Sequence, residues 1–136
     1  MNDSEMLAGG CLCGAVRYSA QAKPFAADYC HCRKCLKSTG APVSAWMDFK
    51  VEQVAWQSKD KLVEYDSSID IRRGFCEKCG STLTFRSVSH PEYLTLAITS
   101  LDNPAMVNPT YHIYTDNQLP WLVINDECRR YPQGQS

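Results

Sequence analysis

The sequence lacks any apolar run approaching the ~20 residues that a membrane-spanning helix needs. Residues 1–5 have neither the basic start nor the apolar core of a signal peptide, so we expect a cytoplasmic protein without an export signal. A formal net charge of −1 gives no electrostatic reason to expect nucleic acid or an anionic membrane as partner. Internal repeats, low-complexity tracts and linkers are also missing, so we interpret the 136 residues as one domain, 1–136.

Helical periodicity is scarce as well. No window of helical length keeps a 3.6-residue apolar period, and only residues 33–38 are expected to form a helical turn. Short β-type runs predict strands at residues 16–19, 25–29, 43–49, 62–65, 82–85 and 93–98. The sequence therefore predicts a mainly β fold of short antiparallel sheets, whose limited core would gain stability from metal clamps.

Cysteine, by contrast, is abundant, with eight residues in the chain. Cys128 stands alone, and the others form three close groups: Cys11 and Cys13; Cys30, Cys32 and Cys35; Cys76 and Cys79. Disulfides usually join distant loops, whereas closely spaced cysteines aim their sulfurs at one point, as a tetrahedral metal requires. Zinc is the favoured interpretation, with disulfides, free thiols and an iron–sulfur cluster as the alternatives.

The seven grouped cysteines do not divide evenly into tetrahedral sites. A set of four closes a structural site, while a set of three leaves one position for water or substrate. Residues 30–35 can direct three sulfurs at one ion from a single tight segment. The two remaining pairs would then share a second ion, and Gly80 would permit the tight turn after Cys79. The spacing thus predicts two zinc ions per chain, one closed and one open.

Other candidate residues receive simpler interpretations. His31 lies between two of the cysteines and could supply a fourth ligand, but a neighbour at i+1 generally points away from the metal that its flanking residues share. His90 and His112 are interpreted as ordinary loop and strand histidines, and Cys128 as a small apolar residue or free thiol. The three tryptophans are expected in the core: Trp46, Trp56 and Trp121.

The cysteine groups belong to longer motifs. These are GGCLCGAVRY at 9–18, CHCRKC at 30–35, RGFCEKCGS at 73–81, SLDNP at 100–104, HIY at 112–114 and PW at 120–121. In this order they resemble the glutathione-dependent formaldehyde-activating enzyme family, which is related to centromere protein V. The resemblance runs from about residue 9 to residue 131. It weakens near the end, where the family tends to read Leu-Pro-Arg-Tyr and this chain reads CRRY at 128–131.

The resemblance implies a β-tent-like fold with two zinc ions. A structural zinc would lie on Cys11, Cys13, Cys76 and Cys79, and a catalytic zinc on Cys30, Cys32 and Cys35. The activity implied is that of a carbon–sulfur lyase or synthase, joining glutathione to formaldehyde or cleaving the S-hydroxymethylglutathione-type adduct.

Three cations flank the proposed catalytic cysteines: Arg33, Lys34 and Lys37. They could offset the charge of three thiolates and contact the carboxylates of glutathione, or they could form a solvated surface. Two functions without catalysis also remain open: a zinc-stabilised binding or interaction module, and a thiol or metal sensor. The oligomeric state is not determined by the sequence.

Overall fold

The computed structural model describes residues 6–134. The expectation about an export signal concerns residues 1–5 and lies outside these residues. Within the described part of the chain, no helix combines the length and apolar character needed to cross a membrane.

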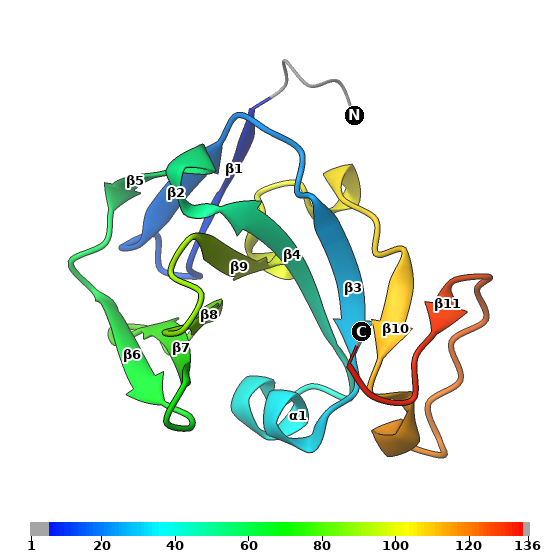
Figure 1. Ribbon diagram of the computed structural model, residues 1–136. Coiled ribbons are helices and arrows are strands. Elements are labelled where there is room, and N and C mark those ends of the chain that lie inside the picture. The colour runs from blue at the N-terminus through cyan, green and yellow to red at the C-terminus, as the bar shows by residue number, and fades with distance from the viewer. Residues whose placement is uncertain (1–5, 135–136) are drawn as a thin grey trace.

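Two β-sheets form the framework of the molecule (Figure 1). The smaller sheet has the order β1-β2-β5, with β1 at Leu7–Gly10, β2 at Arg17–Ala20 and β5 at Val54–Ser58. The larger sheet has the order β11-β10-β3-β4-β9-β8-β7-β6. Its strands, in chain order, are β3 Ala26–Cys30, β4 Ser44–Lys50, β6 Leu62–Asp66, β7 Ile71–Cys76, β8 Thr82–Ser87, β9 Tyr93–Ala97, β10 Tyr111–Ile113 and β11 Arg129–Arg130.

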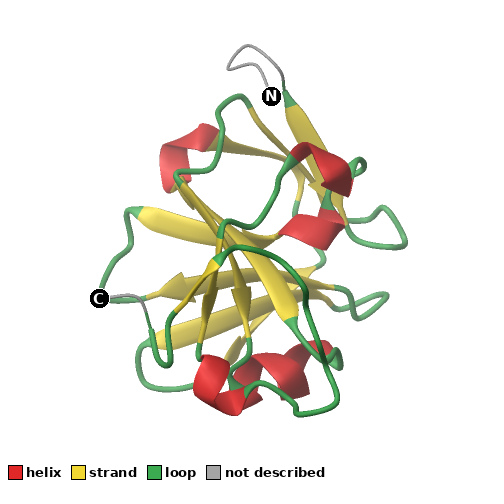
Figure 2. Cartoon of the chain, turned by 90° about the vertical axis from the view of Figure 1, so that its right-hand side faces the viewer, coloured by secondary structure: helices red, strands yellow, loops and turns green. Residues whose placement is uncertain are grey.

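All strand pairs are antiparallel except those that β10 forms with β3 and β11. Helices are short and lie toward the ends of the molecule (Figure 2). They are α1 Arg33–Thr39 and the 3₁₀ helices η1 Val51–Gln53, η2 Ile98–Ser100, η3 Pro104–Met106 and η4 Thr115–Asn117. The expectation of a mainly β fold with short antiparallel sheets is therefore confirmed.

In the central strands of the larger sheet, successive side chains point to opposite faces, and the two faces have different roles. On β4, Met47 and Phe49 are fully buried and pack with Leu96 in the main hydrophobic core. That core also takes Leu7 and Tyr18 from the smaller sheet, so it lies between the two sheets. The intervening residues of each strand point to the opposite face, because successive strand side chains alternate. This second face holds the site described below.

Each predicted strand overlaps an observed one, with ends that differ by no more than two residues, and the structure adds β1, β5, β7, β10 and β11. β7 escaped sequence analysis because Arg72, Arg73 and Gly74 interrupt its apolar pattern. It is nevertheless paired on both sides, with β6 and β8. A Cβ at Gly74 would collide with the Thr84 hydroxyl, so any larger residue there would force the Thr84 side chain to move. The predicted helical turn is a seven-residue helix, α1, that ends at Gly40 in the left-handed conformation.

Candidate functional site

Four cysteines converge where the two sheets approach each other. Cys11 follows β1 directly and Cys76 ends β7, and the sulfurs of Cys11, Cys13, Cys76 and Cys79 all lie within 4.8 Å of one another. The Sγ atoms of Cys11 and Cys13 are 3.6 Å apart, and those of Cys13 and Cys76 are 3.9 Å apart. A zinc ion with Zn–S distances of ~2.3 Å requires sulfur–sulfur edges of ~3.8 Å, so the set fits a tetrahedral zinc.

Two tight turns hold these sulfurs in place. The Gly14 amide donates to the Cys11 carbonyl at 3.1 Å, and the Gly80 amide donates to the Cys76 carbonyl at 2.7 Å. Both glycines have positive φ, 81° and 80°, which other residues adopt at a cost. Ser81 links the two turns, because its hydroxyl accepts from the Leu12 amide at 2.9 Å and lies 3.2 Å from Cys79 Sγ.

The other set of three cysteines is local. Cys30 ends β3, Cys32 caps the N-terminus of α1 by accepting from the Cys35 amide at 3.3 Å, and Cys35 lies in the first turn. Their sulfurs lie within 4.8 Å of one another. Hydrogen bonds with the Cys30 and Cys35 thiols lower the pKa of Cys32, and the contacts with Cys32 and Cys35 raise that of Cys30. All eight cysteines are free in the structure, which contradicts the disulfide alternative.

A buried arginine that sequence analysis did not select contacts this cluster. Arg73 on β7 is only 8% exposed, and its Nη1 lies 3.7 Å from Cys35 Sγ and 3.2 Å from Ser38 Oγ. Its Nε donates to Ser67 Oγ at 3.0 Å, and its guanidinium lies 5.1 Å from the centre of the Phe85 ring. The positive charge of Arg73 also lowers the pKa of Cys32, so a fixed guanidinium offsets thiolate charge from inside the fold.

The three-cysteine cluster opens on a cavity of about 630 Å³. The sheet contributes Asp28, Trp46, Asp48, Phe85 and Arg73 to its wall, and α1 contributes Arg33 and Lys34. Lys37, on the same helix, is exposed and is not among the described residues that line this cavity.

Two carboxylates in the cavity wall were also missed from the sequence. Asp28 is 7% exposed, and its burial, together with the nearby Asp48 charge, raises its pKa to about 7. Burial likewise raises the pKa of Asp48, whose Oδ1 accepts from the Thr95 hydroxyl at 2.6 Å. One sequence signal could have pointed to Asp48. Along β4, Trp46 and Asp48 alternate with the core residues Met47 and Phe49, so they lie on the opposite face of the sheet, which lines the cavity.

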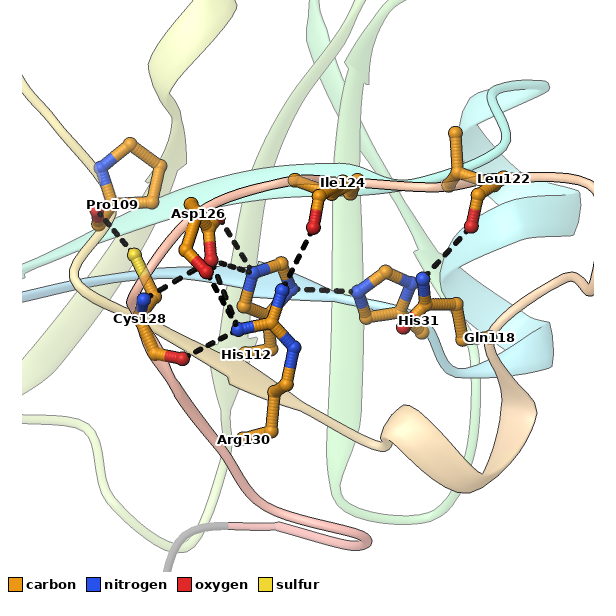
Figure 3. Close-up of polar contacts among 9 residues, drawn as sticks. All are labelled: His31, Pro109, His112, Gln118, Leu122, Ile124, Asp126, Cys128 and Arg130. Carbon is orange, nitrogen blue, oxygen red and sulfur yellow. Dashed lines mark hydrogen bonds and ion pairs between the residues drawn. The ribbon is translucent and has the colours of Figure 1, made fainter.

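His31 belongs to a buried chain of side chains (Figure 3). Its Nε2 lies 2.9 Å from His112 Nδ1, and His112 Nε2 lies 3.0 Å from Asp126 Oδ2. His31 is thus directed toward His112 and is not part of the cysteine group, as its position next to two ligands predicted. His112, Asp126 and Cys128 also lie within ligand distance of one another, but Arg130 occupies Asp126 Oδ1 at 2.9 Å, so we assign no metal there.

The tryptophan predictions need one correction. Trp46 is buried and Trp56 packs against the main core, but Trp121 is 70% exposed. Residues 119–128 form no strand, so neither sheet covers this ring. His90 is an exposed loop residue near Glu92, whereas His112 is fully buried.

Comparison with known proteins gives consistent matches. The family model described as glutathione-dependent formaldehyde-activating enzyme matches residues 6–117. A protein of Halomonas elongata that carries the name of such an enzyme is 25% identical over 135 residues, covering 90% of this chain and 86% of its own. An uncharacterized lyase of Schizosaccharomyces pombe is 32% identical over 101 residues, covering 74% of this chain and 64% of its own.

A solved structure shares the fold. The crystal structure of a Rhodobacter sphaeroides protein superimposes with a TM-score of 0.59 at 22% identity, covering 75% of this chain and 91% of that one.

Proposed function

The chain belongs to the glutathione-dependent formaldehyde-activating enzyme family, and from this premise we propose that it is a zinc-dependent carbon–sulfur lyase or synthase acting on a glutathione–aldehyde adduct. The observation that carries the proposal is the three-cysteine cluster, one ligand short of a tetrahedral set, at the wall of the 630 Å³ cavity. Cavities of about 300–1,000 Å³ are typical of small-molecule sites. The family and the lyase relative support an enzyme of this general kind.

Cys30, Cys32 and Cys35 are the residues that would hold the catalytic zinc, and the four-cysteine set would hold the structural one. Bound zinc would supply a position at which a thiol is held and its thiolate favoured. In the cleavage direction, the carbon–sulfur bond of the adduct breaks with its electron pair going to sulfur, while the hydroxyl proton leaves and formaldehyde forms. The synthase direction reverses these changes.

Side chains of the protein supply positive charge and apolar surface around the three-cysteine cluster. Arg73 offsets the negative charge of the thiolates at the cluster, where a set of three would leave a zinc site at −1. Trp46 and Phe85 present apolar surface to the cavity and exclude water from one side of the reacting sulfur. Arg33 and Lys34 line the cavity and would attract the carboxylates of glutathione.

Calorimetry with the zinc-loaded protein tests the proposal. Glutathione should bind, S-methylglutathione should bind more weakly because its sulfur cannot form a thiolate, and removal of zinc should abolish the sulfur-dependent part. Lys34→Glu should weaken binding about two- to fivefold, more at low ionic strength, because exposed ion pairs contribute about 0.2–1 kcal/mol. Lys37→Glu is the matched control, since Lys37 does not line the cavity, and it should change binding less.

Failure of glutathione to bind at millimolar concentration would overturn the enzyme proposal. The zinc-stabilised binding module would then be the better explanation of the fold, because the four-cysteine set serves the fold whether or not the cavity takes a substrate.

A further inference from the structure

Two carboxylates share the cavity wall with the three-cysteine cluster. Asp28 is two residues before Cys30 on β3, so both side chains point to the same face of the sheet. Asp48 on β4 pairs with Ala26, one pleat further from the cluster, which makes it a diagonal neighbour of Asp28. The cavity therefore has the cysteine sulfurs and the α1 cations Arg33 and Lys34 toward one end and the two carboxylates toward the other.

Neither carboxylate has a cationic partner among residues 6–134. The groups that act on the Asp28 carboxylate are Asp48, the Tyr111 hydroxyl and Cys35, and the Asp48 carboxylate accepts a hydrogen bond from the Thr95 hydroxyl. Asp28 Oδ1 is buried and has no hydrogen-bond partner in the described part of the chain. Arg73, the buried cation of the same cavity, is held instead by Cys35, Ser38 and Ser67.

An unpaired buried carboxylate costs free energy, and a ligand that brings a positive charge into the cavity would remove that cost. A bound ammonium group supplies both the charge and three N–H donors, which suits an unpartnered Asp28 Oδ1. The carboxylates therefore favour a substrate that is cationic at a fixed distance from its sulfur.

Strand geometry gives that distance. Same-face neighbours along a strand are about 7 Å apart, so Asp28 lies about 7 Å from Cys30, and the row of Asp48 lies about 13 Å from it. In glutathione, eight covalent bonds separate the sulfur from the α-ammonium group, roughly 10 Å when extended. A thiol held at the cysteines can thus place this ammonium between the two carboxylates.

We propose that Asp28 and Asp48 form an ammonium subsite of the cavity, which selects thiol substrates that carry a free amino group about eight bonds from the sulfur. For glutathione as the ligand, this inference rests on the proposed function. It assigns the ammonium of the γ-glutamyl end of the substrate to the carboxylates, and leaves the glycyl carboxylate at the other end of the substrate to the cations near α1.

The test compares glutathione with its deamino analogue, in which a glutaryl group replaces the γ-glutamyl group. The zinc-loaded wild type should bind glutathione about tenfold or more tightly than the analogue, because hydrogen bonds to charged groups are involved. Asp48→Asn should reduce this preference to below threefold while binding the analogue as well as the wild type does. Asp102→Asn is the control, because Asp102 pairs with Arg17 and does not line this cavity; it should keep the full preference.

Equal binding of glutathione and its analogue by the wild type would overturn the subsite and leave the proposed function standing. If glutathione fails to bind at all, the proposed function fails, and a second pair of probes decides the subsite. These are 6-aminohexanethiol, whose amine is seven bonds from its sulfur, and 6-mercaptohexanol. A preference for the amine that Asp48→Asn removes would support the subsite, whereas equal affinity or no binding of either would overturn it.

Discussion

Replacing Cys76 by serine removes a sulfur that joins two distant parts of the chain. Cys76 is fully buried at the end of β7, and its Sγ lies 3.9 Å from that of Cys13, 63 residues away in sequence. The proposed structural zinc therefore closes a long loop and fixes the end of β1 against β7. The proposed catalytic zinc closes only residues 30–35, so losing Cys32 should disturb a short segment.

The expected magnitudes differ accordingly. Closing a 63-residue loop rather than a 5-residue one contributes about 2 kcal/mol more to the stability, since the closure entropy grows as (3/2)RT ln n. Structural zinc as a whole contributes about 10–16 kcal/mol in small zinc domains, against total stabilities of about 5–15 kcal/mol. Cys76→Ser should therefore remove most of the net stability of this protein.

Thermal melts with zinc analysis under reducing conditions check this expectation. Cys76→Ser should be unfolded or melt at least about 15 °C lower than the wild type. Cys32→Ser should melt within about 5 °C of it while losing one zinc, and Cys128→Ser, which belongs to neither cysteine set, should keep both ions. If Cys32→Ser melts as early as Cys76→Ser, the division into a structural set and a catalytic set is wrong.

The purified protein should carry two zinc ions. A mild chelator should remove one of them much faster, because a zinc held by only three cysteines is open to exchange; equal loss of both ions would contradict the division into a structural and a catalytic set. Arg73→Lys keeps the charge but loses the planar guanidinium that spans three partners, so chelator competition should show about tenfold weaker zinc binding at the three-cysteine set alone. Gly10→Ala should lower the free energy of unfolding by about 1–3 kcal/mol in denaturant titrations, because its Cβ would collide with the Val16 carbonyl; a neutral result would show that β1 and β2 can separate there.

Local spacing was enough to group the cysteines. Residues 30–35 bring three sulfurs together whatever the rest of the chain does, and the remaining pairs had only each other as partners. The same kind of short-range signal predicted β4, whose alternation separates Met47 and Phe49 from the side chains of the cavity. The tight turn predicted after Cys79 is also present in the structure, where Gly80 has a positive φ.

The rest of the site depends on which strands become neighbours. Arg73 and Asp48 stand in one row only because β7, β8, β9 and β4 pair in that order and register. His112 reaches His31 because β10 pairs in parallel with β3, across 81 residues of sequence. Such pairings are decided by packing of the whole sheet, and no short window of sequence contains them.

The sequence by itself determined the chemistry available to this protein: thiol groups at metal-ligand spacing, in a chain rich in short strands. Tertiary structure alone decided which charges surround those thiols. The exposed cations of α1 are visible in the motif, but the buried Arg73 and the unpartnered Asp28 acquire their roles from burial, which strengthens electrostatic interactions by excluding water. Burial is a property of the folded sheet, and for that reason the sulfur end of the cavity could be predicted and its carboxylate end could not.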